Sequence, residues 1–188
     1  MSHLALAALF LSLIVAPLAA LADEREAWAA LVGGGHIALV RHGNAPPGYG
    51  DPPGFKIDDC ATQRNLDELG RDQARAIGEA FRQHGVAVDK ILSSPLCRCL
   101  ETARLMALGP VESVLVVAAS DRSPEGLPAL KQLVASWRGP GTLVLVTHAF
   151  TIQSLVGIMP KQAETVVVRP RPGDQAGVDL VGKVSAPK

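Results

Sequence analysis

The sequence predicts an α/β fold, a three-layer sandwich in which helices cover both faces of a mostly parallel central sheet. Short apolar runs alternate with segments of helical periodicity, as expected for strands joined by crossover helices. The run at residues 142–147 is apolar almost throughout, which is typical of a strand buried at the centre of a parallel sheet. Two runs end at Arg41-His42 and at His148, and open α/β sheets bind their ligands at such strand ends.

The first 22 residues are predicted to be a secretory signal peptide. They contain no Lys, Arg, Asp or Glu, residues 4–21 are almost wholly apolar, and the segment ends in Ala20-Leu21-Ala22, a small-x-small cleavage site. Residues 23–188 would then form one domain, exported to the periplasm or secreted, with no stable membrane insertion after cleavage. A retained membrane anchor is the alternative, since an apolar stretch of this length could nearly span a bilayer.

Composition argues against a nucleic-acid partner and against a metal site. Lys plus Arg and Asp plus Glu both number 18, and aromatic residues make up 4%, so there is neither a basic excess nor a stacking platform for bases. Export would place the three cysteines in an oxidising compartment. We expect Cys60 to pair with Cys97 or Cys99, because residues 97 and 99 lie two apart on a predicted helix and point in different directions. No Cys or His spacing is of metal-site type.

The mature chain begins with elements that lead to the first strand and its loop. An amphipathic helix is predicted at residues 23–32, and glycines 33–35 connect it to a strand at 36–41, because three glycines end a helix. Residues 45–54 contain four prolines and three glycines, a composition that forms neither helix nor strand. We therefore expect a loop that begins at the strand end, where it is either a lid or specificity element or a plain surface excursion.

Two further helices are predicted from their first residues. Asn65 is a good N-cap, with Glu68 three residues later as its capping partner. Ser94 as the cap and Pro95 as the first helical residue begin the next helix.

The remaining elements follow from apolar runs bounded by Gly and Pro. Strands are predicted at residues 90–92, 114–119, 142–147, 165–168 and 178–184. Helices are predicted at about 123–137 and 150–158. Pro170 and Pro172 suggest that the late strands lie at an edge of the sheet.

Two arginines and two histidines are predicted to converge at one edge of this sheet. Arg41 and His42 follow the first strand, His148 follows the strand at 142–147, and Arg98 lies near the start of a helix that itself follows a strand. Arginine offers a fixed fork of donors for phosphate or carboxylate, and neutral histidine can act as a nucleophile. Such a pocket suits a phosphoryl group, which needs cations on its oxygens and a nucleophile in line.

Three motifs, taken in order, resemble those of the histidine phosphatase superfamily, which includes the phosphoglycerate mutases. They are Leu39-Val40-Arg41-His42-Gly43, then Ser94-Pro95 with Arg98 and Thr102-Ala103, and finally Val146-Thr147-His148. Family-like residues also occur between the first two motifs, at Arg64, Leu66, Gly70, Gln73 and Ala74. The segments around Cys60 and Cys97 look like those of an exported subgroup. The resemblance implies a phosphoglycerate mutase-like fold.

The resemblance also implies roles for the converging residues. His42 would attack phosphorus and become phosphohistidine, which water then hydrolyses. The phosphoryl oxygens would be held by Arg41, Arg98 and His148, with Asn44 and the Gly43 backbone assisting. The arginine charges should keep His42 neutral, as a nucleophile must be. The substrate would be a small phosphorylated molecule, and neither a metal nor another cofactor is implied.

The acid that protonates the leaving group is not recognisable, because the family's usual glutamate-containing signature is missing from the sequence. Asp121 is the favoured candidate, since it follows the predicted strand at 114–119. Glu125 is the alternative, although an acid in the first turn of a helix is equally explained by the helix dipole. Without an acid, good leaving groups such as those of a phosphoramidate or an acyl phosphate could still be cleaved.

A phosphatase that works through phosphohistidine is therefore the predicted function. A catalytically silent phosphate-binding module is the alternative from a different class, and the missing acid is its main support. A phosphomutase is a third option, disfavoured because export would separate the chain from glycolytic phosphoglycerates.

Overall fold

The computed structural model describes residues 16–188 except 47, 49, 121–123, 174–176 and 187–188, with only the backbone described for 16–22. Its helices are α1 (Ala16–Gly33), α2 (Glu68–Gln83), α3 (Cys97–Met106), α4 (Leu127–Ala135) and α5 (Ala149–Val156). Its strands are β1 (Ile37–Arg41), β2 (Val88–Ser93), β3 (Val111–Ser113), β4 (Thr142–Thr147), β5 (Thr165–Arg171) and β6 (Gly177–Val184). Three short 3₁₀ helices complete the described part: η1 (Cys60–Thr62), η2 (Leu115–Ala118) and η3 (Pro124–Gly126).

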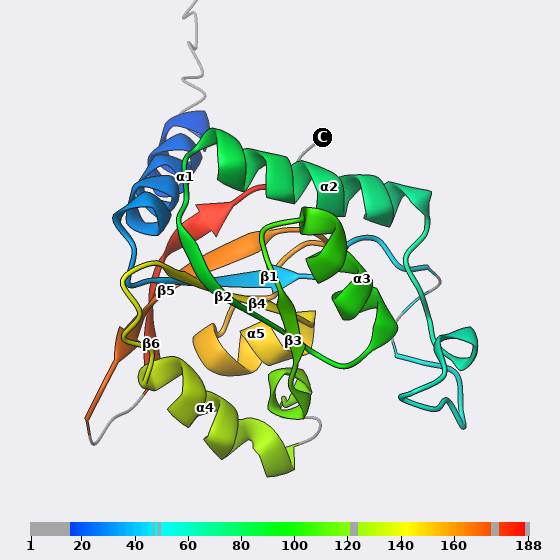
Figure 1. The fold of residues 1–188 in the computed structure, drawn as a ribbon. Coiled ribbons are helices and arrows are strands. Elements are labelled where there is room, and N and C mark those ends of the chain that lie inside the picture. The colour runs from blue at the N-terminus through cyan, green and yellow to red at the C-terminus, as the bar shows by residue number, and fades with distance from the viewer. Residues whose placement is uncertain (1–15, 47, 49, 121–123, 174–176, 187–188) are drawn as a thin grey trace, which may run out of the picture.

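The strands form one six-stranded sheet in the order β3-β2-β4-β1-β5-β6. The first four strands are parallel, whereas β5 runs antiparallel to both β1 and β6. Helices α1, α2 and α3 lie on one side of the sheet, and α4 and α5 lie on the other (Figure 1). This arrangement confirms the predicted three-layer α/β sandwich.

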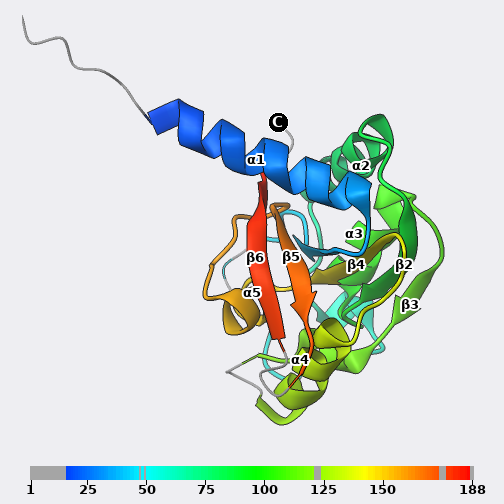
Figure 2. The ribbon, with the colours of Figure 1, turned by 90° about the vertical axis from the view of Figure 1, so that its left-hand side faces the viewer.

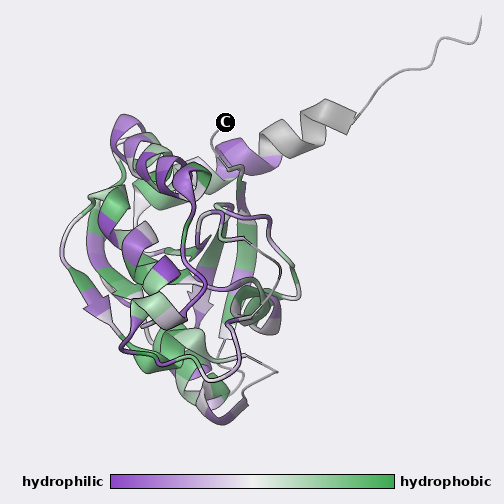
Figure 3. Cartoon of the chain, turned by 90° about the vertical axis from the view of Figure 1, so that its right-hand side faces the viewer, coloured by the Kyte–Doolittle hydropathy of each residue, from purple (hydrophilic) through white to green (hydrophobic). Residues whose placement is uncertain are grey.

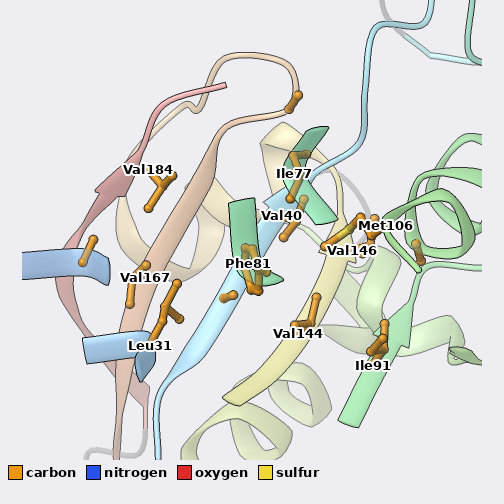
Figure 4. Packing of buried hydrophobic residues seen from close by; sticks show 14 of the residues in the cluster. Leu31, Val40, Ile77, Phe81, Ile91, Met106, Val144, Val146, Val167 and Val184 are labelled. Carbon is orange, nitrogen blue, oxygen red and sulfur yellow. The ribbon is translucent and has the colours of Figure 1, made fainter. Parts of the chain in front are cut away.

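Each face of the sheet packs into its own apolar cluster, which explains the unbroken apolar runs of the central strands. In β1, Ala38 and Val40 face the cluster under α1, α2 and α3, while Ile37 and Leu39 face the cluster under α4 and α5. Phe81 of α2 is fully buried in the first cluster (Figure 4). The central strands are accordingly hydrophobic and α2 carries many hydrophilic residues (Figure 3). A strand buried on both faces has no polar side to alternate with.

The predicted strand at residues 114–119 is wrong. The edge strand β3 is Val111–Ser113, and the apolar run after it forms the 3₁₀ helix η2. Val117 is fully buried against the second cluster, and its N–H donates to the carbonyl of Val114 at 3.1 Å, which closes a turn. A short apolar run satisfies either conformation, so periodicity alone could not separate them.

Two predicted helix caps are also wrong, because both side chains make other hydrogen bonds. The N-cap of α2 is Asp67, whose carboxylate accepts from Gly70 N–H at 2.8 Å. Asn65 instead donates from Nδ2 to the Cys60 carbonyl at 2.6 Å. The N-cap of α3 is Leu96, without a side-chain cap, so Pro95 lies outside the helix.

Elements at the two ends of the chain depart from their predicted bounds. Helix α1 begins at Ala16, before the helix predicted from residue 23, and it packs across β6 (Figure 2). Within the described residues, no helix is both long enough and apolar enough to cross a membrane. Pro170 lies in β5, which is not an edge strand, but it pairs only with Val178 of β6, because the pairing of β5 with β1 ends at Val168.

Candidate active site

A cavity of about 240 Å³ opens at the carboxyl ends of the central strands, where a ligand of an α/β sheet is expected. Its walls combine the ends of β1 and β4 with the starts of α3 and α5 and with part of the proline-rich loop. The lining residues are Arg41, His42, Gly50, Arg64, Arg98, Ala118, Ser120, His148, Ala149, Phe150 and Thr151. The four residues predicted to converge, Arg41, His42, Arg98 and His148, therefore lie in one cavity.

His42 is fixed at the end of β1 in a single tautomer. Its backbone N–H donates to the Thr147 carbonyl at 3.0 Å, which ties it to the end of β4. Its ring Nδ1 lies 2.8 Å from the Gly43 carbonyl oxygen. A carbonyl oxygen only accepts, so Nδ1 carries the proton and donates. Nε2 therefore keeps its lone pair, which is what a nucleophilic imidazole requires.

Burial keeps both histidines of the cavity neutral. Desolvation of the His42 ring lowers its pKa to about 3, and the positive charges of Arg98, Arg41 and Arg64 add to that effect, while the hydrogen bond to the Gly43 carbonyl opposes it. Burial likewise lowers the pKa of His148 well below its usual range, assisted by the charge of Arg98. The arginine charges were expected to keep His42 neutral, but burial is the larger cause.

His148 is held between Arg98 and Ser94. Nη2 of Arg98 donates to His148 Nδ1 at 3.4 Å, so the neutral ring carries its proton on Nε2 and donates to Ser94 Oγ at 2.8 Å. The ring centroids of His42 and His148 are 5.5 Å apart at an interplanar angle of 65°. Ser94, predicted as a helix cap, is thus a partner of the second histidine.

Three buried arginines surround the histidines. Arg41 donates from Nη1 to the Pro160 carbonyl at 2.7 Å. Arg98 donates from Nη1 to both carboxylate oxygens of Asp51, at 2.8 and 3.0 Å. Arg64 donates to the carbonyls of Gly50 and Gly48 at 3.0 and 2.8 Å. Burial lowers the pKa of Arg64, with the charge of Arg98 adding to the effect.

Arg64 and Asp51 are the site residues that sequence analysis missed. Arg64 carried a signal, since it is among the family-like residues between the first two motifs, but no role in the site was predicted for it. Asp51 lies in the Pro/Gly loop and pairs with Arg98, a residue 47 positions away in the chain. No local pattern marks such a contact.

Gly43 and Asn44 lie beside the cavity and are absent from its lining. A Cβ on Gly43 would lie 2.4 Å from the Gly70 carbonyl oxygen, so this glycine permits close packing of α2 against the strand end. Its N–H donates to Thr102 Oγ1 at 3.2 Å. Asn44 donates from Nδ2 to Asp67 at 2.6 Å. Their predicted assistance to substrate binding remains a prediction.

Neither candidate acid is among the described residues that line the cavity. Asp121 falls outside the residues that the structure describes. Glu125, in η3, lines a separate apolar cavity, and Ala118 is part of the lining of both cavities. Among the described residues, no Asp or Glu lines the candidate active-site cavity.

The predicted disulfide joins Cys60 to Cys97, one of the two expected pairings. It fastens η1 to the first residue of α3, directly before Arg98. Cys99 is free and buried, and its sulfur lies 3.6 Å from His148 Nε2. Burial raises the pKa of the Cys99 thiol to about 12, so it is not a thiolate nucleophile at neutral pH.

Comparison with known proteins finds a family similar to the first part of the chain. The sequence model of the histidine phosphatase superfamily (branch 1) matches residues 37–118, which include Arg41, His42, Arg64 and Arg98. Over these residues the chain is similar to the histidine phosphatase superfamily. His148 lies beyond the matched residues, but the structure places it in the same cavity.

Among curated proteins, the chain is similar to the mitochondrial serine/threonine-protein phosphatase Pgam5 of Drosophila willistoni, with 34% identity over 71 residues. That match covers 38% of this chain and 21% of the relative, so the chain corresponds to about a fifth of that protein.

Solved structures share the fold at low sequence identity. The protein histidine phosphatase SixA in complex with tungstate matches with a TM-score of 0.57 and 15% identity, over 80% of this chain and 97% of that chain. A mycobacterial glucosyl-3-phosphoglycerate phosphatase matches with a TM-score of 0.57 and 20% identity, over 80% of this chain and 99% of that chain.

Proposed function

We propose that the protein is a phosphatase that hydrolyses a phosphomonoester or a phosphoramidate through a phosphohistidine on His42. The observation that carries the proposal is a buried, neutral His42 whose Nε2 keeps its lone pair among three arginines. A neutral imidazole nucleophile and fixed cations on the transferred phosphoryl group are the two requirements of this chemistry.

The formal charge of the cavity suits a phosphoryl dianion. Among the described residues, Arg41, Arg64 and Arg98 of the lining contribute three positive charges and the two histidines are neutral. Asp51, which pairs with Arg98 but is not part of the lining, contributes one negative charge, so the net charge is two positive. A phosphate monoester carries roughly −1.5 to −2 at neutral pH. The match favours a dianionic phosphoryl group.

The proposed reaction has two steps. His42 Nε2 attacks phosphorus, the P–N bond forms, and the bond to the leaving group breaks with its electron pair. Water then attacks the phosphohistidine, the P–N bond breaks, and inorganic phosphate leaves with His42 neutral again. Arg41, Arg98 and His148 would stabilise the phosphoryl oxygens in both steps.

The leaving group needs a proton only if it is a poor one. Asp121 is the proposed donor and Glu125 the alternative, in line with their positions in the sequence between the second and the final motif. A substrate with a good leaving group, such as an acyl phosphate or a phosphoramidate whose leaving nitrogen already carries a proton, would be cleaved without that acid. Substrates with poor leaving groups therefore require that one of these two carboxyl groups donates a proton.

Hydrolysis of p-nitrophenyl phosphate tests the function against its main rival, a silent phosphate-binding module. We expect turnover by the wild type and its loss in His42→Ala. The matched control is His84→Ala, since His84 is exposed at the end of α2 and stacks on Trp28 away from the cavity. Tight binding of inorganic phosphate without turnover would favour the silent module, and turnover retained in His42→Ala would reject the nucleophile.

We also propose that residues 1–22 are a signal peptide and that the protein is exported. Support comes from the charge-free apolar segment and from the Cys60–Cys97 disulfide, a bond typical of oxidising compartments. Mass spectrometry of the exported protein should find an N-terminus at Asp23. An intact N-terminus in the membrane fraction would support the retained anchor.

A further inference from the structure

Asp51 is a buried carboxylate that the proline-rich loop carries to the site. Its side chain is 4% exposed and that of Arg98 is 5% exposed. Both carboxylate oxygens accept from Arg98 Nη1, and Oδ1 also accepts from the backbone N–H of Arg64 at 2.9 Å. A buried carboxylate with this many donors is built into the site and is not a surface ion pair.

Arg64 holds the loop that carries Asp51 through hydrogen bonds to the loop backbone. The Arg64 guanidinium donates to the carbonyls of Gly50 at 3.0 Å and Gly48 at 2.8 Å, and also to that of Ala45. These bonds fix the backbone on the N-terminal side of Asp51, while the Arg64 N–H holds its carboxylate. Gly48, Gly50 and Asp51 are thus held beside the cavity.

The contact with Asp51 leaves one edge of Arg98 for a ligand. In a planar guanidinium, the N–H groups of Nε and Nη2 point out from the same edge, and Nη1 is not part of that edge. Asp51 occupies Nη1, whereas Nε is buried and has no hydrogen-bond partner among the described residues. Nη2 donates only weakly, at 3.4 Å, to His148. A phosphoryl group could accept from Nε and Nη2 together, as guanidinium forks commonly allow.

We propose that Asp51 is a positioning residue, which orients Arg98 so that its Nε–Nη2 edge faces the phosphoryl group. This inference rests on the proposed phosphatase function and adds a residue to its machinery. Asp51 acts as a carboxylate and through Arg98. Because both of its oxygens already accept from N–H donors, it is not the acid that protonates the leaving group.

A double-mutant cycle tests this role, with p-nitrophenyl phosphate hydrolysis as the readout. Asp51→Asn should lower kcat/KM about 100-fold, the loss typical of a misplaced catalytic group. In an Arg98→Gln background, the same substitution should change kcat/KM by less than about 3-fold, since Asp51 acts through Arg98. The matched control is Asp58→Asn, an exposed residue of the same segment, which should retain wild-type kinetics. Equal losses in the two backgrounds, or no loss in the first, would overturn the proposal.

Folding and the dependence on the proposed function are controlled separately. Asp51→Asn leaves a buried arginine without its counter-ion, so Asp51→Glu provides a charge-conserving variant. If the Asn variant does not fold, a loss of at least about 10-fold in Asp51→Glu that vanishes in Arg98→Gln would support the role, and an equal loss in both backgrounds would refute it. A wild type without turnover would refute the phosphatase function instead. The same cycle would then be measured as affinity for inorganic phosphate. A change in affinity that occurs only where Arg98 is present would support the positioning role, and equal changes in both backgrounds would reject that role.

Discussion

Removal of the Cys60–Cys97 disulfide should destabilise the fold while leaving the site assembled. The two cysteines are 37 residues apart in sequence. In the loop-entropy treatment, a closed loop of this length corresponds to about 4 kcal/mol at 25 °C. For a chain of this size that equals a fall in melting temperature of roughly 8–16 °C.

Hydrogen bonds around the disulfide explain why the site should survive its removal. Gln63 accepts from the Cys97 N–H at 2.8 Å and donates to the carbonyls of Lys56 and Ile57, each at 2.9 Å. These contacts join the same two segments that the disulfide joins. We therefore expect kcat/KM at 25 °C to stay within about 3-fold of the wild type.

The assay is urea unfolding of Cys60→Ala/Cys97→Ala beside the wild type, each with and without a reducing agent. Reductant should lower the free energy of unfolding of the wild type to that of the variant and should leave the variant unchanged. A loss below about 1 kcal/mol would refute the entropic reasoning. Full stability together with lost activity would show that the disulfide positions Arg98 directly.

Two further predictions concern protonation. The free energy of unfolding should fall as the pH is lowered from 6.5 toward 3, by about 1.4 kcal/mol per pH unit from His42 alone, because the unfolded chain binds a proton that the folded ring, with its pKa of about 3, does not. Urea titrations at pH 7 and pH 5 check this, and equal stability at both would contradict it; His148 acts in the same direction. Asp121→Asn should slow the hydrolysis of alkyl phosphates more than that of p-nitrophenyl phosphate, and equal slowing of both would remove Asp121 from the acid role.

The sequence predicted those parts of the fold in which local pattern and tertiary environment agree. Strands β1 and β4 were found because they are buried on both faces and are apolar without interruption. Their ends placed Arg41, His42 and His148 correctly in one cavity. Arg98 was also placed there correctly, because it lies near the start of a helix that follows a strand.

The errors occur where a distant partner decides the local structure. Ser94 looks like a helix cap, but its hydroxyl meets His148, 54 residues away. Asp51 looks like one polar residue in a turn-rich loop until the fold brings it to Arg98. At residues 114–119, the demand to bury Val117 beneath a turn overrides the strand tendency of an apolar run. Such contacts leave no periodic trace in the chain.

The central claim is that His42 becomes phosphorylated. Acid hydrolyses phosphohistidine, so the protein has to be denatured in alkali. We would react the protein with a labelled phosphoryl donor, denature it in alkali, and map the label by peptide mass spectrometry. The account predicts an acid-labile, base-stable phosphate on His42 of the wild type and none in His42→Ala. A wild type that turns over the donor but never carries phosphate on His42 would contradict it.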